Sequence, residues 1–192
     1  MMTTAITIRP FQGSEEAALI DLWNISMPYD RVTPAVFRTK VLLDLNFHPD
    51  GLLVALCEER PVGFVLSLAR RVPQFLDGVE PEKAWITAFG VHPDFRRQGI
   101  GSALFDAALT RLAGLGQNEV LISPYTPNYF VPGVDVSAYP HTLAFLHATG
   151  WETVSKPISM QVDTTGFQIS PEVLAREQAL AAEGFTVRPV TS

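Results

Sequence analysis

Residue types that bind phosphate are concentrated in one short stretch of the chain, VHPDFRRQGIGS at residues 91–102. Gly99 and Gly101 have no side chains, so a ligand can approach the backbone there. They stand where a helix is predicted to begin, and the first amides of a helix lack internal partners and lie at its positive end. Arg96 and Arg97 add positive charge. The stretch therefore predicts a site for a phosphate compound.

Two common phosphate motifs do not fit this stretch. A dinucleotide-binding loop would have a third glycine where the chain has Leu104, and a nucleoside-triphosphate loop would have a lysine directly before its Ser or Thr, where the chain has Gly101. The other interpretation of the stretch is a tightly packed helix start with two solvated arginines.

With its flanking elements, the stretch resembles the acetyl-coenzyme A binding motif of the GNAT N-acetyltransferases. The family signature is Arg/Gln-x-x-Gly-x-Gly/Ala after a strand that often ends in Val-His-Pro, and RRQGIG at residues 96–101 matches every defined position. The order of elements matches over about residues 5–163, and AFLHATGWE at 144–152 resembles the family's second motif. The resemblance implies an acyltransferase that moves an acetyl group from acetyl-CoA to a primary amine.

The resemblance also implies how acetyl-CoA is bound. The strands 84–91 and 119–123 are expected to splay apart and hold the pantetheine arm, while N–H groups from Arg97 to Ser102 hold the pyrophosphate. The arginine side chains either help the phosphates or face water. An amide near Val91 is expected to stabilise negative charge on the thioester oxygen during direct attack by the amine. No metal is expected, and the predicted cofactor residues are Phe89, Val91, Arg96, Arg97, Gln98, Gly99, Gly101 and Ser102.

The catalytic residues of many family members do not carry over to this chain. The tyrosine that protonates the thiol corresponds to Leu146, and the glutamate of the strand before the phosphate loop corresponds to about Thr87. Two hypotheses therefore stay open, an active N-acetyltransferase and a catalytically degenerate acyl-CoA-binding or sensing domain. The catalytic residues stay unknown, and the nearby candidates are Tyr129, Asp135, Tyr139, His141 and His147.

By the same resemblance, the acceptor would lie between the loops 26–34 and 124–140. Their aromatic and acidic residues suit a small-molecule or peptide amine with a positive charge and an apolar body. The alternative is that the aromatic residues anchor a long loop to the core. The residues concerned are Tyr29, Asp30, Tyr125, Asn128, Tyr129, Phe130 and Asp135.

The elements that must position this motif follow from hydrophobic patterns. Strands are predicted at 5–9, 51–58, 62–70, 84–91, 119–123 and 151–162, and helices at about 14–24, 33–45, 99–115 and 141–149. The second helix is expected to bury Val36, Val41, Leu42 and Leu45, and the third to bury Ile100, Leu104, Ala108, Leu112 and Leu115. The order predicts an α/β protein with the GNAT fold, a central mixed and mostly antiparallel sheet with helices on both faces.

Composition limits the classes of partner. The chain has 192 residues, 47% of them hydrophobic, and a formal net charge of −6, which disfavours general nucleic-acid binding. We expect no membrane span and no secretion signal. The single cysteine, Cys57, allows no intrachain disulfide and is expected to be buried and inert. These features favour a cytoplasmic protein.

The C-terminal part of the chain repeats a sequence from its beginning. After the domain expected at 1–163, SPEVLAREQALAAEG at 170–184 predicts a helix within a linker at 164–184. FTVRP at 185–189 then matches ITIRP at 6–10. One interpretation is that 185–192 is the first strand of a second GNAT-like repeat in a tandem protein. The other is a C-terminal strand that completes this sheet or, in a homodimer, a partner's sheet.

Overall fold

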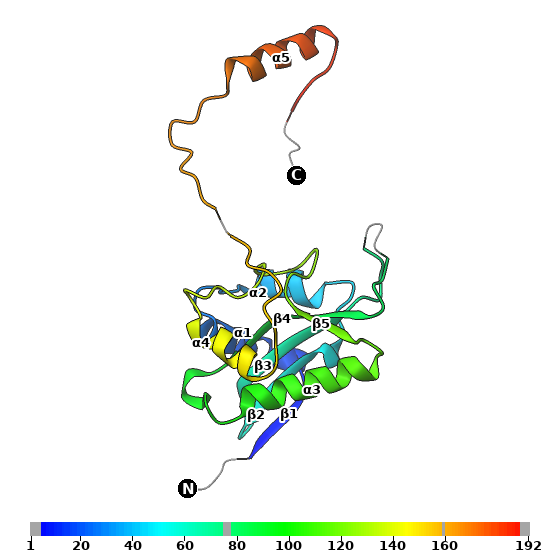
Figure 1. Cartoon of the computed structure of the whole chain (residues 1–192), viewed down its shortest axis with the longest axis vertical. Coiled ribbons are helices and arrows are strands. Elements are labelled where there is room, and N and C mark those ends of the chain that lie inside the picture. The colour runs from blue at the N-terminus through cyan, green and yellow to red at the C-terminus, as the bar shows by residue number, and fades with distance from the viewer. Residues whose placement is uncertain (1–4, 75–77, 159, 189–192) are drawn as a thin grey trace. The chain divides into compact units, whose positions relative to one another are not determined.

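The structure of the protein is a computed structural model, which describes residues 5–74, 78–158 and 160–188. The chain divides into two compact units, Met1–Pro157 and Ile158–Ser192. The first unit contains the whole sheet and is shown with its helices in Figure 1.

The first unit is built on one five-stranded sheet in the order β1-β2-β3-β4-β5. Neighbouring strands pair antiparallel except β4 and β5, which run parallel. The prediction of a mixed, mostly antiparallel sheet is therefore confirmed, as is the hairpin of the second and third strands. The strands are β1 (Ile6–Pro10), β2 (Leu52–Cys57), β3 (Arg60–Ala69), β4 (Lys83–Val91) and β5 (Glu119–Ile122).

Helices cover both faces of the sheet because its central strands are apolar on both sides. Every residue of β2 is buried, a pattern typical of strands that are covered on both faces. Helix α3 (Ile100–Gly114) lies along one face, and α1 (Glu16–Ser26) with α2 (Pro34–Phe37) lies on the other (Figure 1). Helix α4 (Pro140–Ala148) joins the α3 side through Leu146, which is buried among its core residues.

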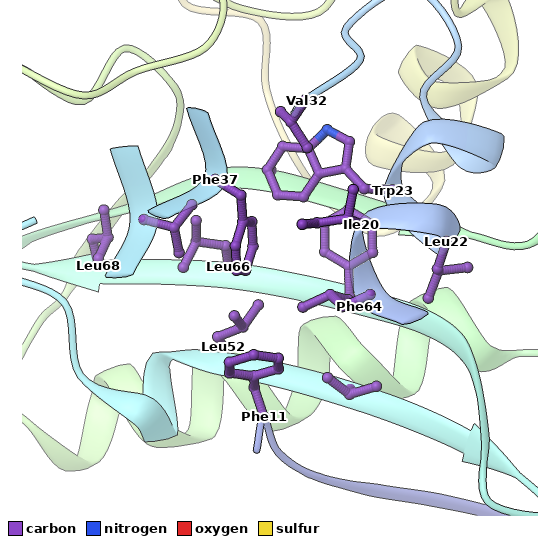
Figure 2. Close-up of a cluster of buried hydrophobic side chains, with 14 of the residues drawn as sticks. Phe11, Ile20, Leu22, Trp23, Val32, Phe37, Leu52, Phe64, Leu66 and Leu68 are labelled. Atoms are coloured by element: carbon purple, nitrogen blue, oxygen red, sulfur yellow. The ribbon is translucent and has the colours of Figure 1, made fainter. Parts of the chain in front are cut away.

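The core on the α1 side is aromatic. Trp23 of α1 stacks on Phe64 of β3 with ring centroids 4.9 Å apart, and Phe37 of α2 meets Trp23 edge-on at 6.3 Å. Figure 2 shows these side chains gathered over β3 together with Leu66 and Leu68. This packing holds α1 against the sheet and thereby fixes the position of its C-terminal residue, Ser26.

The core on the α3 side follows the predicted helical stripe. Ile100, Leu104, Ala108 and Leu112 are all buried, whereas Leu115 is 55% exposed because α3 ends at Gly114. Cys57 is buried on this side, as expected.

Two expectations about elements were wrong. Residues 151–158 and 160–162 form no strand, and Val154, Ile158, Met160 and Val162 are each at least 80% exposed. An alternating sequence forms a strand only when a neighbouring strand pairs with it. Pro157 also lacks the backbone N–H that would donate a hydrogen bond in the middle of this segment.

The second helix is shorter than predicted. Its α-helical part ends at Phe37, five residues in π-helical form follow, and Leu45 lies in the loop beyond with 77% of its surface exposed.

The second unit contains one helix, α5 (Pro171–Ala182). Its start has the predicted signals, because Ser170 accepts a hydrogen bond from the Val173 amide and Pro171 occupies the first turn. Phe185–Arg188 form no strand, and residues 189–192 lie outside the described residues. The assignment of 164–184 as a linker and of 185–192 to a second repeat stays a prediction.

Candidate functional site

The sheet opens between β4 and β5 partway along β4. The two strands pair from Lys83 with Glu119 to Ile86 with Ile122. The Ser123 amide then donates a last hydrogen bond to the Ile86 carbonyl over 2.9 Å. Beyond Ile86, the edge of β4 that faced β5 borders an open space.

A bulge at Thr87 decides which groups of β4 face this opening. The pairing of β3 with β4 shifts at this point, since Ser67 lies opposite Ile86 and Leu66 opposite Ala88. After the bulge, the His92 amide donates to Val62 of β3 over 2.8 Å. Because backbone groups alternate sides along a strand, Ala88 and Gly90 also face β3. The N–H and C=O groups of Phe89 and Val91 therefore face the opening, which is the direction expected for contact with pantetheine.

The opening is part of a cleft of about 660 Å³. Its walls come from the end of β4, the start of α3, the end of α1, the loop after β5 and the start of α4. Seven of the eight predicted cofactor residues line it. They are Phe89, Val91, Arg96, Arg97, Gly99, Gly101 and Ser102.

The start of α3 has the backbone geometry of an anion site. Gly99 precedes the helix with φ of 80°, in the left-handed region that suits glycine, and Arg97 also has a positive φ of 62°. A Cβ atom on Gly101 would lie 3.5 Å from the Phe145 ring, so the backbone at Gly101 is in close but unstrained contact with α4. The unpaired amides of the first turn of α3 and the positive end of the helix dipole are exposed to the cleft.

The polar side chains of the loop before α3 have different roles. Gln98 is the eighth predicted cofactor residue, and its side chain turns back to donate to the Asp94 carbonyl at 3.3 Å. Arg96 donates from Nε to the Val91 carbonyl at 3.0 Å and from Nη2 to the Ser26 carbonyl at 3.2 Å. Within the described part of the chain, no side-chain hydrogen bond or ion pair of Arg97 occurs. The two arginines are thus not equivalent.

The two positions that depart from the family pattern are both buried. Leu146 is 4% exposed and packs in the core on the α3 side. Thr87 is 5% exposed and lines the cleft, and its hydroxyl has no hydrogen-bond partner among the described residues. A buried hydroxyl without a partner is unfavourable by about 1–3 kcal/mol, so this one is suited to a hydrogen bond with a bound molecule.

The candidate catalytic side chains separate into two groups. Asp135, Tyr139 and His141 line the cleft. Tyr129 and His147 do not line it. His147 lies 3.0 Å from the Thr153 hydroxyl, and the Tyr129 carbonyl accepts a hydrogen bond from Lys40.

Tyr139 is held on the α1 side of the cleft. Its hydroxyl accepts a hydrogen bond from the Tyr29 amide at 3.2 Å, and the two rings meet edge-on. Burial, and then hydrogen bonding to the Asp30 carboxylate, raise the pKa of Tyr139 well above its usual value. Asp30 lines the same cleft, and no lysine or arginine pairs with it among the described residues.

The other predicted acceptor residues mostly anchor their loop. Tyr125 is fully buried in the core, Asn128 donates to the Asp44 carboxylate at 2.6 Å, and Phe130 packs on Trp23 with ring centroids 4.9 Å apart. In Asp135, one carboxylate oxygen accepts from the Ser137 and Ala138 amides, which shapes the turn before α4.

The sequence indicated residues 26–34 as a loop beside the acceptor, but it did not indicate that the end of α1 forms part of the cleft wall. Ser26 and Met27 line the cleft from the end of this helix. Gly90 was the residue that could have indicated this contact, because a Cβ atom there would lie 2.3 Å from the Ser26 hydroxyl oxygen. A glycine within an otherwise apolar strand indicates close approach of another segment.

The model of the Acetyltransferase (GNAT) family matches residues 17–129, which include the bulge, the loop before α3 and α3 itself. The chain belongs to this family. The GNAT assignment agrees with the sequence resemblance and with the observed sheet. No curated protein gives a significant match to the sequence of this GNAT chain.

Solved structures resemble this GNAT protein in fold. A transcriptional regulator from Bacillus halodurans C-125 is 18% identical with a TM-score of 0.59, and the match covers 82% of this chain and 100% of that one. The ribosomal-protein-S18-alanine N-acetyltransferase from Escherichia coli is 14% identical with a TM-score of 0.56, covering 79% and 80%. An aminoglycoside acetyltransferase from an uncultured soil metagenomic sample is 20% identical with a TM-score of 0.57, covering 85% and 99%.

Two further observations concern partners of the GNAT chain. In the described ranges, no helix is both long and apolar enough to cross a bilayer. Nor do the described residues contain a group of three or more His, Cys, Asp or Glu side chains placed to hold a metal ion.

Proposed function

We propose that the protein transfers an acetyl group from acetyl-CoA to a primary amine. The observation that carries this proposal is the cleft itself, in which the open edge of β4 and the start of α3 meet a wall from α1. The open edge of β4 and the start of α3 suit a thioester on a phosphate-bearing arm. The wall from α1 borders the space that the acceptor would occupy.

The residues present fit acetyl-CoA. The amides at the start of α3 suit the pyrophosphate, because Gly99 and Gly101 leave the backbone accessible there. Backbone groups of Phe89 and Val91 face the gap next to β5 and suit the amides of the pantetheine arm. Acetyl-CoA supplies the reaction with an activated acyl group, a thioester.

An ammonium acceptor loses two protons in the reaction. One goes to water before the attack, and the other leaves the nitrogen after the C–N bond has formed and ends on the departing thiolate or in water. The amine nitrogen attacks the thioester carbonyl carbon, a C–N bond forms, the C–S bond breaks, and the thiolate leaves. The Val91 amide, which faces the cleft, is expected to donate a hydrogen bond to the carbonyl oxygen as negative charge develops on it. An alkylamine with a pKa near 10 is mostly protonated at neutral pH, so its deprotonation limits the population that can attack.

The leaving thiolate needs no acid from the protein. A thiol has a pKa of about 8.5, so thiolate is an adequate leaving group. Because the pKa of Tyr139 is raised above the usual value for a phenol, proton transfer from Tyr139 to a thiolate is unfavourable. Tyr139 therefore acts by holding the Asp30 carboxylate through its hydroxyl and not as an acid, and Leu146 contributes packing only.

The acceptor is a cationic amine held on the α1 side of the cleft. The Asp30 carboxylate lines the cleft without a lysine or arginine partner among the described residues, and Tyr29 and Tyr139 place aromatic rings beside it. A carboxylate next to aromatic rings favours an ammonium group over a neutral one.

Release of free thiol from acetyl-CoA, measured across a panel of amines, tests this function. The panel pairs each diamine with the monoamine of the same length, and turnover is expected to favour the diamines. Asp30→Asn should raise KM for diamines about tenfold, whereas Asp106→Asn, on the outer face of α3, should change nothing. Tight binding of acetyl-CoA with no turnover above hydrolysis for any amine would instead support the degenerate binding or sensing domain.

A further inference from the structure

Arg96 connects the loop before α3 with the end of α1. Its Nε donates to the Val91 carbonyl at 3.0 Å and its Nη2 donates to the Ser26 carbonyl at 3.2 Å. The Ser26 carbonyl belongs to the last turn of α1, where carbonyl groups lack intrahelical partners and the helix dipole is negative. A guanidinium is well suited to this place because it carries a positive charge and several fixed donors.

The same point in the structure is closely packed. A Cβ atom on Gly90 would lie 2.3 Å from the Ser26 hydroxyl oxygen and 3.0 Å from the Phe64 ring. Ser26 is 4% exposed, and its hydroxyl donates to the Leu22 carbonyl at 2.7 Å. The end of α1 thus rests directly on the backbone of β4, and Arg96 binds both elements at this contact.

The two segments that Arg96 connects through their backbone carbonyls both line the cleft. One segment carries the amides suited to pyrophosphate, from Arg97 to Ser102, and the other carries Met27 and Asp30, one and four residues after Ser26. The Asp30 amide is itself bonded to the Met27 carbonyl at 3.1 Å. Arg96 therefore joins the cofactor loop to the segment that carries the proposed acceptor carboxylate by a short chain of hydrogen bonds.

We propose that Arg96 is a positioning residue that couples the occupancy of the acetyl-CoA site to the order of the acceptor wall at residues 22–30. When phosphate binding orders the loop before α3, Arg96 holds the Ser26 carbonyl more firmly, and the wall that bears Asp30 becomes more ordered. This inference rests on the proposed function, because it assumes that acetyl-CoA occupies the cleft.

Arg97 provides a matched comparison. It is the next residue, has the same charge and lines the same cleft, but among the described residues its side chain makes no hydrogen bond to α1 or β4. Loss of either arginine removes one positive charge near the phosphates. Only loss of Arg96 removes the connection to α1.

The experiment is amide hydrogen exchange, read on peptides covering residues 22–31, with and without coenzyme A. In the unchanged protein, coenzyme A is expected to slow exchange of these peptides about fivefold, the factor that corresponds to one net hydrogen bond. In Arg96→Met the slowing should vanish although coenzyme A still binds by calorimetry. In Arg97→Met affinity should fall while the slowing persists at saturation. Arg96→Lys, which can make one of the two bonds, should give a partial effect.

The outcomes separate this inference from the proposed function. If the unchanged protein does not bind coenzyme A, the proposed function fails and this inference with it. If it binds and peptides 22–31 slow equally in Arg96→Met and the unchanged protein, only the coupling is refuted. Equal losses of affinity in Arg96→Met and Arg97→Met, with no difference in exchange, would make Arg96 an ordinary phosphate ligand. Thermal melting of each variant without ligand checks that the fold is retained.

Discussion

The Tyr125 hydroxyl donates a hydrogen bond over 2.9 Å to the carboxylate of Asp44, which lies 81 residues earlier in the chain. Both residues are buried. The other oxygen of Asp44 accepts from Asn128, and Asn46 donates to the Tyr125 hydroxyl at 2.8 Å. A buried carboxylate is tolerated only when its oxygens are hydrogen-bonded. This network fixes the loop after β5, which forms one wall of the cleft.

Tyr125→Phe should lower the free energy of unfolding by about 1–3 kcal/mol, because it leaves the Asp44 carboxylate short of one donor in a buried place. Urea denaturation followed by tryptophan fluorescence measures the change. Tyr129→Phe is the matched control, since Tyr129 is 40% exposed in the same loop, and it should stay within about 0.5 kcal/mol of the unchanged protein. Equal stabilities of the two variants would mean that the Asp44 network contributes nothing.

Gly101 should accept alanine but not valine. A single Cβ atom there meets the Phe145 ring at an ordinary 3.5 Å and Val91 at 3.9 Å. Gly101→Ala should therefore fold normally and change affinity for acetyl-CoA less than about threefold. The branched side chain of Gly101→Val extends into the space next to the first-turn amides, and affinity should fall at least about tenfold, or 1.4 kcal/mol. Calorimetry on folded variants decides, and unchanged affinity in Gly101→Val would place the phosphates elsewhere.

The backbone shape of the loop before α3 was predictable from the sequence because its signals are local. Gly99 has a positive φ, which glycine adopts without strain, and Gly101, two residues later, leaves the backbone at the start of α3 accessible. The central strands β2, β3 and β4 were also predictable, since each is mainly a run of buried apolar residues.

The place of the end of α1 in the cleft wall could not be predicted in the same way, because its contacts are distant in sequence. Arg96 and Ser26 are 70 residues apart, and nothing near Arg96 indicates that it caps a helix. The prediction of a strand at 151–162 was wrong for a related reason. The alternation of Val154 and its neighbours does not specify which other strand would pair with this segment.

Leu146 should act through packing alone. Leu146→Ala removes most of a side chain buried in the core on the α3 side, and it should cost about 2–4 kcal/mol of stability. Leu146→Met nearly conserves volume, so turnover per folded molecule should match the unchanged protein. Turnover is measured after the folded fraction has been determined by circular dichroism. A tenfold loss of kcat in Leu146→Met would show that this position takes part in the reaction.

The contribution of the Arg9–Glu15 ion pair to the stability of the protein should depend on pH. Hydrogen bonding from Arg9 is the main cause that lowers the pKa of Glu15 below its usual value. A carboxylate with a lowered pKa in the folded state stabilises the protein above the pKa of the unfolded state, about 4.3, and loses that contribution as pH falls through the folded value. Arg9→Met should therefore be less stable at pH 7 by about 0.5–1 kcal/mol, a modest value because both side chains are partly exposed. The difference should shrink toward zero below about pH 4. A difference that is independent of pH would assign the effect of Arg9 to packing.

Removal of the Thr87 hydroxyl in Thr87→Val should affect stability and activity in opposite directions. The hydroxyl of Thr87 is buried in the cleft with no partner among the described residues, so its replacement by a methyl group of similar size removes an unfavourable burial. Urea denaturation should show a stability that is unchanged or higher by up to about 1 kcal/mol. If the hydroxyl bonds a bound substrate, the same variant should lose about three- to tenfold in kcat/KM with the best amine of the panel, the range for one hydrogen bond. Thr87→Ser keeps the hydroxyl and should retain most of that activity. Loss of stability in Thr87→Val with full activity would mean that the hydroxyl already has a partner within the protein.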